Sequence, residues 1–271
     1  MALMPSLLIK AGSGALTLGV PSSPGVPAEL AAHTITLSFN DIDGVRAAFA
    51  ELGPKIACVI VEPIQGEGGI ILPQDGFLQE IRERCDRVGA LLIFDEIQTG
   101  IGRTGLMFAF EHWDTIPDIL ALAKGFGGGM PLGGFVSSSG IMSVFKTHPV
   151  LGHITTFGGH PVSCAAGLAS MEVLLKEGLV KEVAGKEKLF RHHLVHPLIK
   201  EIRGMGLFLA VELGSAEKVQ KLISLAKDEG IVTDWFIFHD TAFRIAPPLI
   251  ITPDQIRDVC DRLQKLLEKC R

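Results

Sequence analysis

Two neighbouring stretches of the sequence decide the fold, LLIFDEIQTGIGRTG at residues 91–105 and PDILALAKGFGGGMPLGG at residues 117–134. Each contains a short apolar run, and such a run bounded by turn residues indicates a strand inside a parallel sheet. The first run ends at Asp95 and the second at Lys124. Ligands of open α/β sheets collect at the carboxyl ends of the strands. We therefore expect these two side chains to lie at one site.

The residues around these stretches extend the same pattern. ACVIVEP at residues 57–63 predicts a strand buried on both faces, and residues 75–88 predict an amphipathic helix. A strand, a helix and a strand at this spacing indicate a right-handed βαβ unit of a parallel sheet. Residues 41–52 predict a further helix, and residues 132–139 a further strand.

The C-terminal part also alternates helices and strands, but fewer of its strands are fully apolar. Helices are predicted over residues 161–176, 180–198 and 216–228 and from Thr252–Pro253 onward, and strands over 207–213, 231–238 and 242–248. We place a domain boundary near residue 200. Residues 1–200 then form a partial large domain with a parallel-rich sheet, and residues 201–271 a small C-terminal α+β domain.

Composition bounds the class of protein. The chain has 271 residues, of which 47% are hydrophobic, so a sizeable core is expected and bulk disorder is excluded. A net charge of -5 without a basic run argues against nucleic acid as a partner. No apolar run approaches the roughly 18 residues of a membrane span. The five cysteines form no CxxC pair and the histidines show no metal spacing, which predicts reduced thiols, no metal and a cytoplasmic protein.

Lys124 and Asp95 are the residue types that pyridoxal 5'-phosphate (PLP) chemistry requires. A lysine between a buried strand and a glycine turn can be desolvated, which lowers its pKa and makes the amine nucleophilic. A carboxylate keeps the pyridinium nitrogen of the cofactor protonated. Taken singly, an aspartate at a strand end is more often a helix cap, and a lysine before glycine more often a solvated C-cap. Their joint occurrence in long motifs favours the functional interpretation.

In their full context, residues 91–105 and 117–134 resemble the class III aminotransferases, which include ornithine, acetylornithine and omega-amino acid aminotransferases. The resemblance runs from about Ala57 to the C-terminus. It implies the α/β fold of PLP-dependent transferases of fold type I, like aspartate aminotransferase. It also implies transfer of an amino group from an amino acid or ω-amine to a 2-oxo acid such as 2-oxoglutarate, with PLP as cofactor.

The resemblance assigns cofactor contacts. Lys124 matches the Schiff-base lysine, which also moves the proton during catalysis, and Asp95 matches the partner of the ring nitrogen. Gln98 matches the residue that hydrogen-bonds the phenolic oxygen. In TTFGGHP, Thr156 matches the threonine that reaches across a homodimer interface to the phosphate of the neighbouring PLP, and Thr155 beside it is a further candidate for cofactor binding. The alternative for Thr156 is an N-cap of the helix that follows.

Two further motifs match substrate contacts. In VEPIQGEGG, Glu62 and Glu67 match the acidic residues that face the substrate. In the ornithine-type branch, the second glutamate pairs with an arginine that matches Arg244 of FRIAPP, and this arginine then releases to bind a substrate α-carboxylate. The alternatives are a solvated loop acid for Glu67 and a surface strand charge for Arg244. Arg103 of GRTG is expected to hold its loop.

The sequence departs from this family in two places. The N-terminal part of the family fold is expected to be missing, together with its phosphate-binding turn and the aromatic residue that stacks on the ring. Residues 7–54 resemble glutamate-1-semialdehyde aminomutase instead, with the loop at residues 11–30 in the place of a mobile gate. A chimera, a gene fragment and a natural branch all remain open. The alternative functions are therefore glutamate-1-semialdehyde 2,1-aminomutase, or a truncated and inactive fold that only dimerises.

Overall fold

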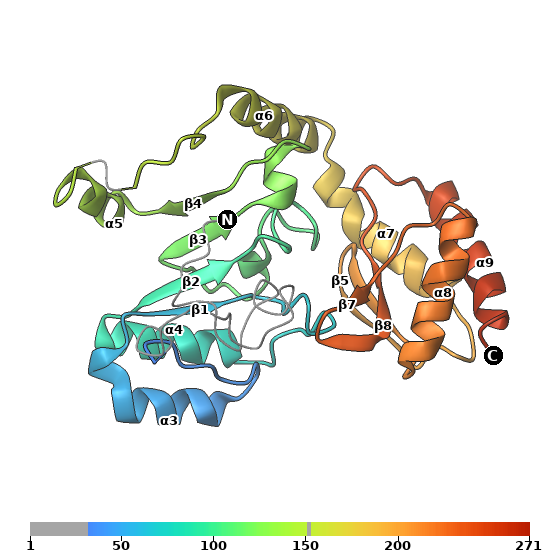
Figure 1. The fold of residues 1–271 in the computed structure, drawn as a ribbon, viewed down its shortest axis with the longest axis horizontal. Coiled ribbons are helices and arrows are strands. Elements are labelled where there is room, and N and C mark those ends of the chain that lie inside the picture. The colour runs from blue at the N-terminus through green and yellow to red at the C-terminus, as the bar shows by residue number, and fades with distance from the viewer. Residues whose placement is uncertain (1–31, 151–152) are drawn as a thin grey trace.

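A computed structural model describes residues 32–150 and 153–271, and shows two sheets side by side (Figure 1). Helices α6 (Pro161–Lys176) and α7 (Leu179–His193) lead from the first sheet to the second. The predicted loop at residues 11–30 lies outside the described residues. Within the part of the chain that is described, no helix is long and apolar enough to cross a membrane.

The first sheet carries the two motif strands at its centre. Its order is β1-β2-β3-β4, and the strands are β1 (Cys58–Val61), β2 (Leu91–Asp95), β3 (Ile119–Leu122) and β4 (Gly134–Ser137). The first three are parallel, as predicted, and β4 runs antiparallel to β3. Asp95 pairs with Ala121. This register brings the carboxyl ends of β2 and β3, and with them Asp95 and Lys124, to the same edge.

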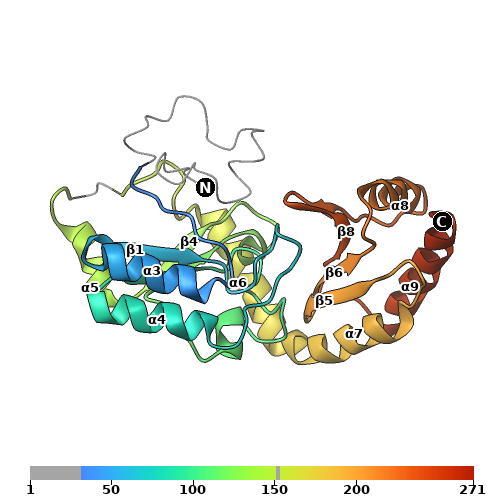
Figure 2. The ribbon, with the colours of Figure 1, turned by 90° about the horizontal axis from the view of Figure 1, so that it is seen from below.

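Helices α3 (Ile42–Leu52) and α4 (Phe77–Val88) cover one face of this sheet (Figure 2). Both helices are confirmed, and α3 begins where Asp41 accepts a hydrogen bond from the Gly44 N–H at 2.8 Å. Their apolar faces pack on Leu92 and Phe94 of β2. The prediction that β1 is buried on both faces is wrong, since Cys58 is exposed and Ile60 is 48% exposed. The cause is that β1 is an edge strand of the described sheet, and these two helices cover only the opposite face.

The glycine run after Lys124 packs the turn against a helix. The turn η4 (Lys124–Gly127) contacts α6, and a Cβ added at Gly128 would lie 2.4 Å from the carbonyl oxygen of Ala166. Gly128 also has a positive φ of 58°, which glycine adopts at little cost. Shorter elements complete this part: η2 (Gly53–Lys55), η3 (Ala109–His112), α5 (Ser139–Met142) and η5 (Ser143–Lys146).

The second sheet is antiparallel, with the order β5-β6-β8-β7. Its strands are β5 (Glu201–Met205), β6 (Phe208–Glu212), β7 (Trp235–Phe236) and β8 (His239–Ile245). Helices α7, α8 (Ala216–Asp228) and α9 (Pro253–Glu268) pack on it around a core that includes Phe190, Leu222, Phe243 and Leu263. Helix α9 begins at the predicted residue, with a capping box between Thr252 and Gln255.

Two predictions for this part are corrected, and one strand was missed. The strand expected over residues 231–238 shrinks to Trp235–Phe236, because the register shifts there and the chain turns back to pair Phe236 with His239. The helix expected to residue 198 ends at His193, shortly before Pro197, which cannot continue a helix. Strand β5 was not predicted, since its charged and glycine-containing sequence lacks an apolar run.

Candidate active site

Lys124 lies in a strained turn at the end of β3. It follows Leu122 by two residues and begins η4, and its φ is 49°. A positive φ is uncommon for a residue with a side chain and costs about 1–3 kcal/mol. Such strain clusters at functional sites, so the backbone supports the importance that the motif gives to Lys124.

A cavity of about 170 Å³ adjoins Lys124 and lies between the two sheets. The β2–η3 loop and η4 form one wall. The other wall consists of residues on or next to strands β6 and β8 of the second sheet, namely Phe208, Arg244 and Ala246. The remaining lining residues are Ile97, Gln98, Gly100, Ile101, Arg103 and Gly125. Three of the predicted site residues, Lys124, Gln98 and Arg244, therefore meet at one cavity.

Burial lowers the pKa of the Lys124 ammonium group. Glu67, Asp95 and Glu62 raise it through their negative charges, while Arg244 lowers it further. These charges act on Lys124 because strand ends and loops from three regions of the chain converge there. A lysine with a lowered pKa has a larger neutral fraction, and its amine is a better nucleophile.

Asp95 is a half-buried carboxylate at the same strand edge. Burial raises its pKa, while a hydrogen bond from the Ile97 N–H to Oδ1 at 3.0 Å and the charge of Lys124 oppose that effect. Because a cation beside such a carboxylate favours its charged form, Asp95 is suited to accept a positively charged ring nitrogen.

Glu67 and Arg244 form an ion pair at the cavity. Nη2 of Arg244 donates to Oε1 of Glu67 at 2.8 Å, and Gln98 donates from Nε2 to the same oxygen at 3.2 Å. Burial raises the pKa of Glu67, but the hydrogen bond and charge of Arg244 outweigh it, so that the pKa lies below its usual range. The side chains of Glu67 and Arg244 are 13% and 23% exposed. Neither is the solvated surface charge that was the alternative.

Arg244 is held on several sides. Its guanidinium carbon lies 4.8 Å from the centre of the Phe236 ring, and Nη1 donates to Oε1 of Gln98 at 3.4 Å. Its Nε is buried and has no hydrogen-bond partner within the described residues. A guanidinium with one unsatisfied nitrogen retains capacity for an oxygen ligand.

Glu62 follows β1 and completes the acidic side of the site. Its Oε2 accepts from the Gly66 N–H at 2.9 Å. The pKa of Glu62 is raised from 4.5 to about 7, mainly by burial. The charges of Asp95 and Glu67 add to this rise, and the hydrogen bond from Gly66 opposes it. Near neutral pH, Glu62 is therefore divided between its protonated and charged forms.

Thr155 and Thr156 are not brought to this cavity. Both lie exposed in the loop before α6, and neither lines the cavity at Lys124. The alternative that Thr156 caps the helix is wrong, because the N-cap of α6 is His160. Any contact of these threonines with a cofactor would therefore have to be made at another site.

Backbone groups that the sequence does not reveal also contact Glu67. The Ile237 N–H donates to Oε2 of Glu67 at 3.3 Å, and the Phe238 N–H donates to its carbonyl oxygen at 3.1 Å. Every residue type offers the same backbone N–H, so no sequence motif could reveal these contacts.

The prediction for Arg103 is confirmed. Its Nη1 donates to the Leu207 carbonyl at 3.1 Å, which holds its loop to the chain just before β6 of the second sheet.

Comparison with known proteins shows that this chain is similar to aminotransferases. The family model described as class-III aminotransferase matches residues 11–267. The ornithine aminotransferase of Toxoplasma gondii is 35% identical with a TM-score of 0.78, over 86% of this chain and 55% of that one. The acetylornithine aminotransferase of Elizabethkingia anophelis is 34% identical with a TM-score of 0.79, over 87% and 60%. A transaminase of the marine bacterium Virgibacillus is 29% identical with a TM-score of 0.81, over 97% and 66%.

The chain spans little more than half the length of the first of these solved structures. One structure of the Toxoplasma gondii enzyme is described as having partial occupancy of PLP at the active site. The matched region includes the strands and turns that carry Asp95, Lys124 and Arg244.

Proposed function

The chain belongs to the class III aminotransferase family, and from that premise we propose that it is a PLP-dependent aminotransferase. Its fold is the α/β fold of PLP-dependent transferases of fold type I, partial relative to the solved relatives. The proposed reaction moves an amino group from an amino acid or ω-amine to a 2-oxo acid such as 2-oxoglutarate. The observation that carries the proposal is that Lys124 lines this cavity, is desolvated by burial, and lies close enough to Asp95 for their charges to interact.

The residues present fit one side of the cofactor. Lys124 offers a nucleophilic amine for the aldehyde, Asp95 offers a carboxylate for the ring nitrogen, and Gln98 offers an amide for the phenolic oxygen. When bound, PLP supplies an electron sink for the substrate α-carbon. Lys124 Nζ takes up and returns the proton of that carbon, because its lowered pKa leaves part of it unprotonated.

Arg244 and the two glutamates are proposed to bind the substrate. Arg244 accommodates a carboxylate through its planar fork, once Glu67 releases it. Gln98 hydrogen-bonds both members of the closed pair and so helps to hold Glu67 and Arg244 in place until a carboxylate binds. Glu62 faces the same charges and can exchange a proton near neutral pH.

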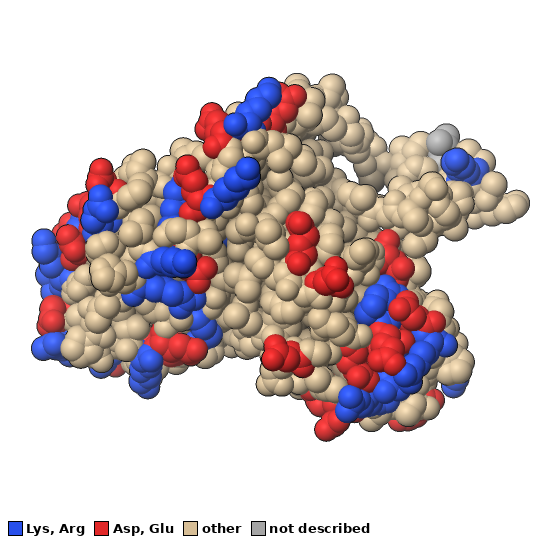
Figure 3. Space-filling model, turned by 180° about the vertical axis from the view of Figure 1, so that it is seen from behind, with Lys and Arg blue, Asp and Glu red and all other residues tan. Residues whose placement is uncertain are grey.

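The phosphate is proposed to be held across a homodimer. Thr155 and Thr156 are exposed, and large apolar side chains around them are exposed as well, namely Val144, Val150, Ile154 and Phe157. The arm that carries α5 is largely free of charged groups on the face shown in Figure 3. Exposed apolar groups of this extent indicate an interface. Light scattering should show a dimer, and a monomer would contradict this assignment.

Covalent trapping at Lys124 tests the proposed function directly. The protein is mixed with PLP, reduced with borohydride and digested, and the mass of the reduced adduct is located by peptide mapping. The adduct should lie on Lys124 and vanish in Lys124→Arg, which keeps the charge. Lys146→Arg is the control, because that lysine is exposed on η5 and outside the cavity. Modification at another lysine in place of Lys124 would refute the proposal.

A half-reaction separates transamination from the aminomutase alternative. The PLP-loaded protein is first charged with an amino donor, and 2-oxoglutarate is then added while absorbance is followed. Return of the starting spectrum supports transfer to a 2-oxo acid, whereas no return with any 2-oxo acid favours the aminomutase. Absence of both PLP absorbance and a lysine adduct would favour a fold that only dimerises.

A further inference from the structure

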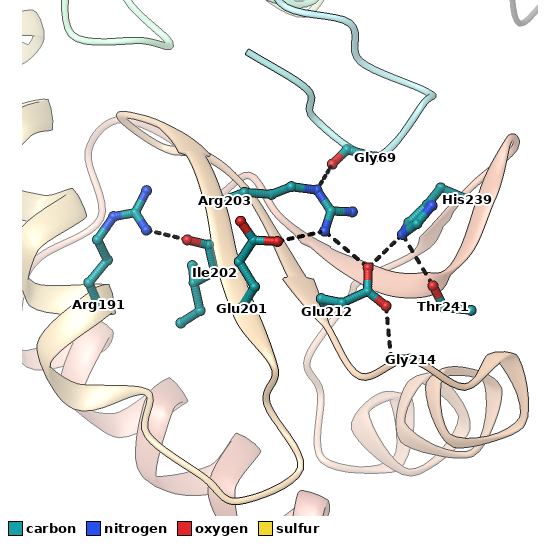
Figure 4. Close-up of polar contacts among 9 residues, drawn as sticks. All are labelled: Gly69, Arg191, Glu201, Ile202, Arg203, Glu212, Gly214, His239 and Thr241. Atoms are coloured by element: carbon teal, nitrogen blue, oxygen red, sulfur yellow. Dashed lines mark hydrogen bonds and ion pairs between the residues drawn. The ribbon is translucent and has the colours of Figure 1, made fainter.

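Arg203 connects the second sheet to the turn that carries Glu67. It lies on β5, its side chain is 18% exposed, and its Nε donates to the carbonyl oxygen of Gly69 at 2.6 Å (Figure 4). Its Nη1 donates to Oε2 of Glu212 on β6 at 3.0 Å. One guanidinium thus spans a strand of the second part and a loop of the first, which are separated by 134 residues of sequence.

Glu212 holds the guanidinium of Arg203 through the hydrogen bond to Nη1. Its Oε2 also accepts from Nε2 of His239 at 2.5 Å, and its Oε1 accepts from the Gly214 N–H at 2.8 Å. Burial raises the pKa of Glu212, but these partners and Arg203 outweigh it and lower the pKa to about 2. The carboxylate is therefore charged over the whole neutral range, and it orients Arg203 towards the turn.

The turn that Arg203 contacts is closed and tightly packed. Gln65 and Ile71 form its bridge, and Ile70, inside it, is fully buried against Phe208 and Phe236 of the second sheet. Gly69 has a φ of 100°, and a Cβ there would lie 2.7 Å from Nη2 of Arg203. The guanidinium therefore lies directly against the backbone, two residues from Glu67.

We propose that Arg203 is a positioning residue of the candidate site, which holds the Gly69 carbonyl and thereby sets Glu67 for its ion pair with Arg244. This role rests on the proposed function of that pair, because it concerns how readily Arg244 becomes free for a substrate carboxylate. Arg203 does not line the cavity at Lys124, so it acts through the turn and not by contact with a ligand.

A second arginine that bonds strand β5 provides a control. Arg191 of α7 also donates to backbone carbonyls, those of Ile202 and Gly204, and it lies on the other side of β5 from the turn (Figure 4). Arg191 is more exposed than Arg203, at 36% against 18%, but it too bonds a carboxylate and backbone carbonyls, and Arg191→Met removes these bonds without a contact to Gly69. It therefore separates general loss of packing around β5 from loss of the tether.

Hydrogen exchange followed by mass spectrometry tests the tether without requiring activity. In Arg203→Met, amides of residues 65–71 should exchange at least about tenfold faster, because a hydrogen bond from a charged donor is lost. Arg203→Lys should fall between that variant and the wild type, and it also covers the case in which Met prevents folding. Arg191→Met should leave this segment unchanged. Unaltered exchange in both Arg203 variants, or equal acceleration in Arg191→Met, would overturn the proposal.

Glutarate titration tests the link to Glu67. Arg203→Met should raise the affinity for this dicarboxylate up to about fivefold, the range of a partly exposed ion pair. In a Glu67→Gln background the same substitution should have no effect, and an equal effect in both backgrounds would overturn the link. If glutarate does not bind the wild type at all, the proposed carboxylate site fails, while hydrogen exchange still decides the role of Arg203.

Discussion

Glu62→Gln is expected to reduce the pH dependence of the free energy of unfolding. Burial raises the pKa of Glu62 from 4.5 to about 7 in the folded protein. Between these values the folded state holds more protons than the unfolded state, so stability falls as the pH rises through this window. Above about pH 7 the full penalty of keeping a charged carboxylate beside Asp95 and Glu67 is present.

The difference between the unfolded-state pKa of 4.5 and the folded-state pKa of about 7 corresponds to a change of about 3 kcal/mol in the free energy of unfolding over the whole pH range. Integration between about pH 5 and about pH 8 gives a change of about 2–3 kcal/mol from this one group. Gln preserves an oxygen for the Gly66 N–H and has the same shape. The substitution therefore removes the titration with little loss of packing.

Urea unfolding without added cofactor, followed by tryptophan fluorescence, measures this effect at several pH values. Glu62→Gln should gain stability over the wild type by about 2–3 kcal/mol as the pH rises from about 5 to about 8. Glu51→Gln is the control, because Glu51 is exposed near the end of α3. If the wild type and Glu62→Gln show parallel pH profiles, the carboxylate is not desolvated and the reasoning fails.

Four other substitutions test separate parts of the structure. The pKa shift of Glu80 is opposite to that of Glu62, because hydrogen bonds from Arg46 and Arg84 lower the pKa of Glu80 to about 2. Its contribution to stability is present above about pH 4.5 and is lost as the pH falls towards 2. Glu80→Gln should therefore be less stable than the wild type at neutral pH, and the difference in the free energy of unfolding should vanish in acid. Phe243→Ala should cost about 3–5 kcal/mol in urea unfolding, since Phe243 is fully buried in the second core, and a loss below about 1 kcal/mol would contradict that core. Calorimetry with glutarate should show tighter binding for Glu67→Gln and loss of binding for Arg244→Met, whereas weaker binding in both would refute release of Arg244 from the ion pair.

The sequence predicted the features that depend on local pattern. The apolar runs that end at Asp95 and Lys124 predicted the central parallel strands, and the register of a parallel pair places both strand ends at one edge. The cap at Thr252 predicted the first residue of α9, because capping is a contact between near neighbours. Short and irregular elements such as β7 were overestimated, since an apolar run alone does not reveal where a strand loses its register.

Exposure of a strand face could not be predicted either. ACVIVEP has the composition of a fully buried strand, yet Ile60 is 48% exposed on the edge strand β1. Burial depends on which elements pack on a strand, and that information is not contained in the strand itself. The contacts of Glu67 with the backbone of Ile237 and Phe238 are hidden for a similar reason, because every residue type offers the same N–H.

The sequence by itself determined the family, the central strands and the identity of Lys124 and Asp95 as the residues of interest, because these depend on residue types at short spacing. Only the tertiary structure decided that Glu67 meets Arg244 across 177 residues of chain, and that Arg203 hydrogen-bonds the turn that carries Glu67. It also decided the positive φ of Lys124 and the burial that lowers the pKa of its amine. Desolvation and ion pairing arise from distant segments packed together, and these terms set the chemistry of side chains that the motif can only name.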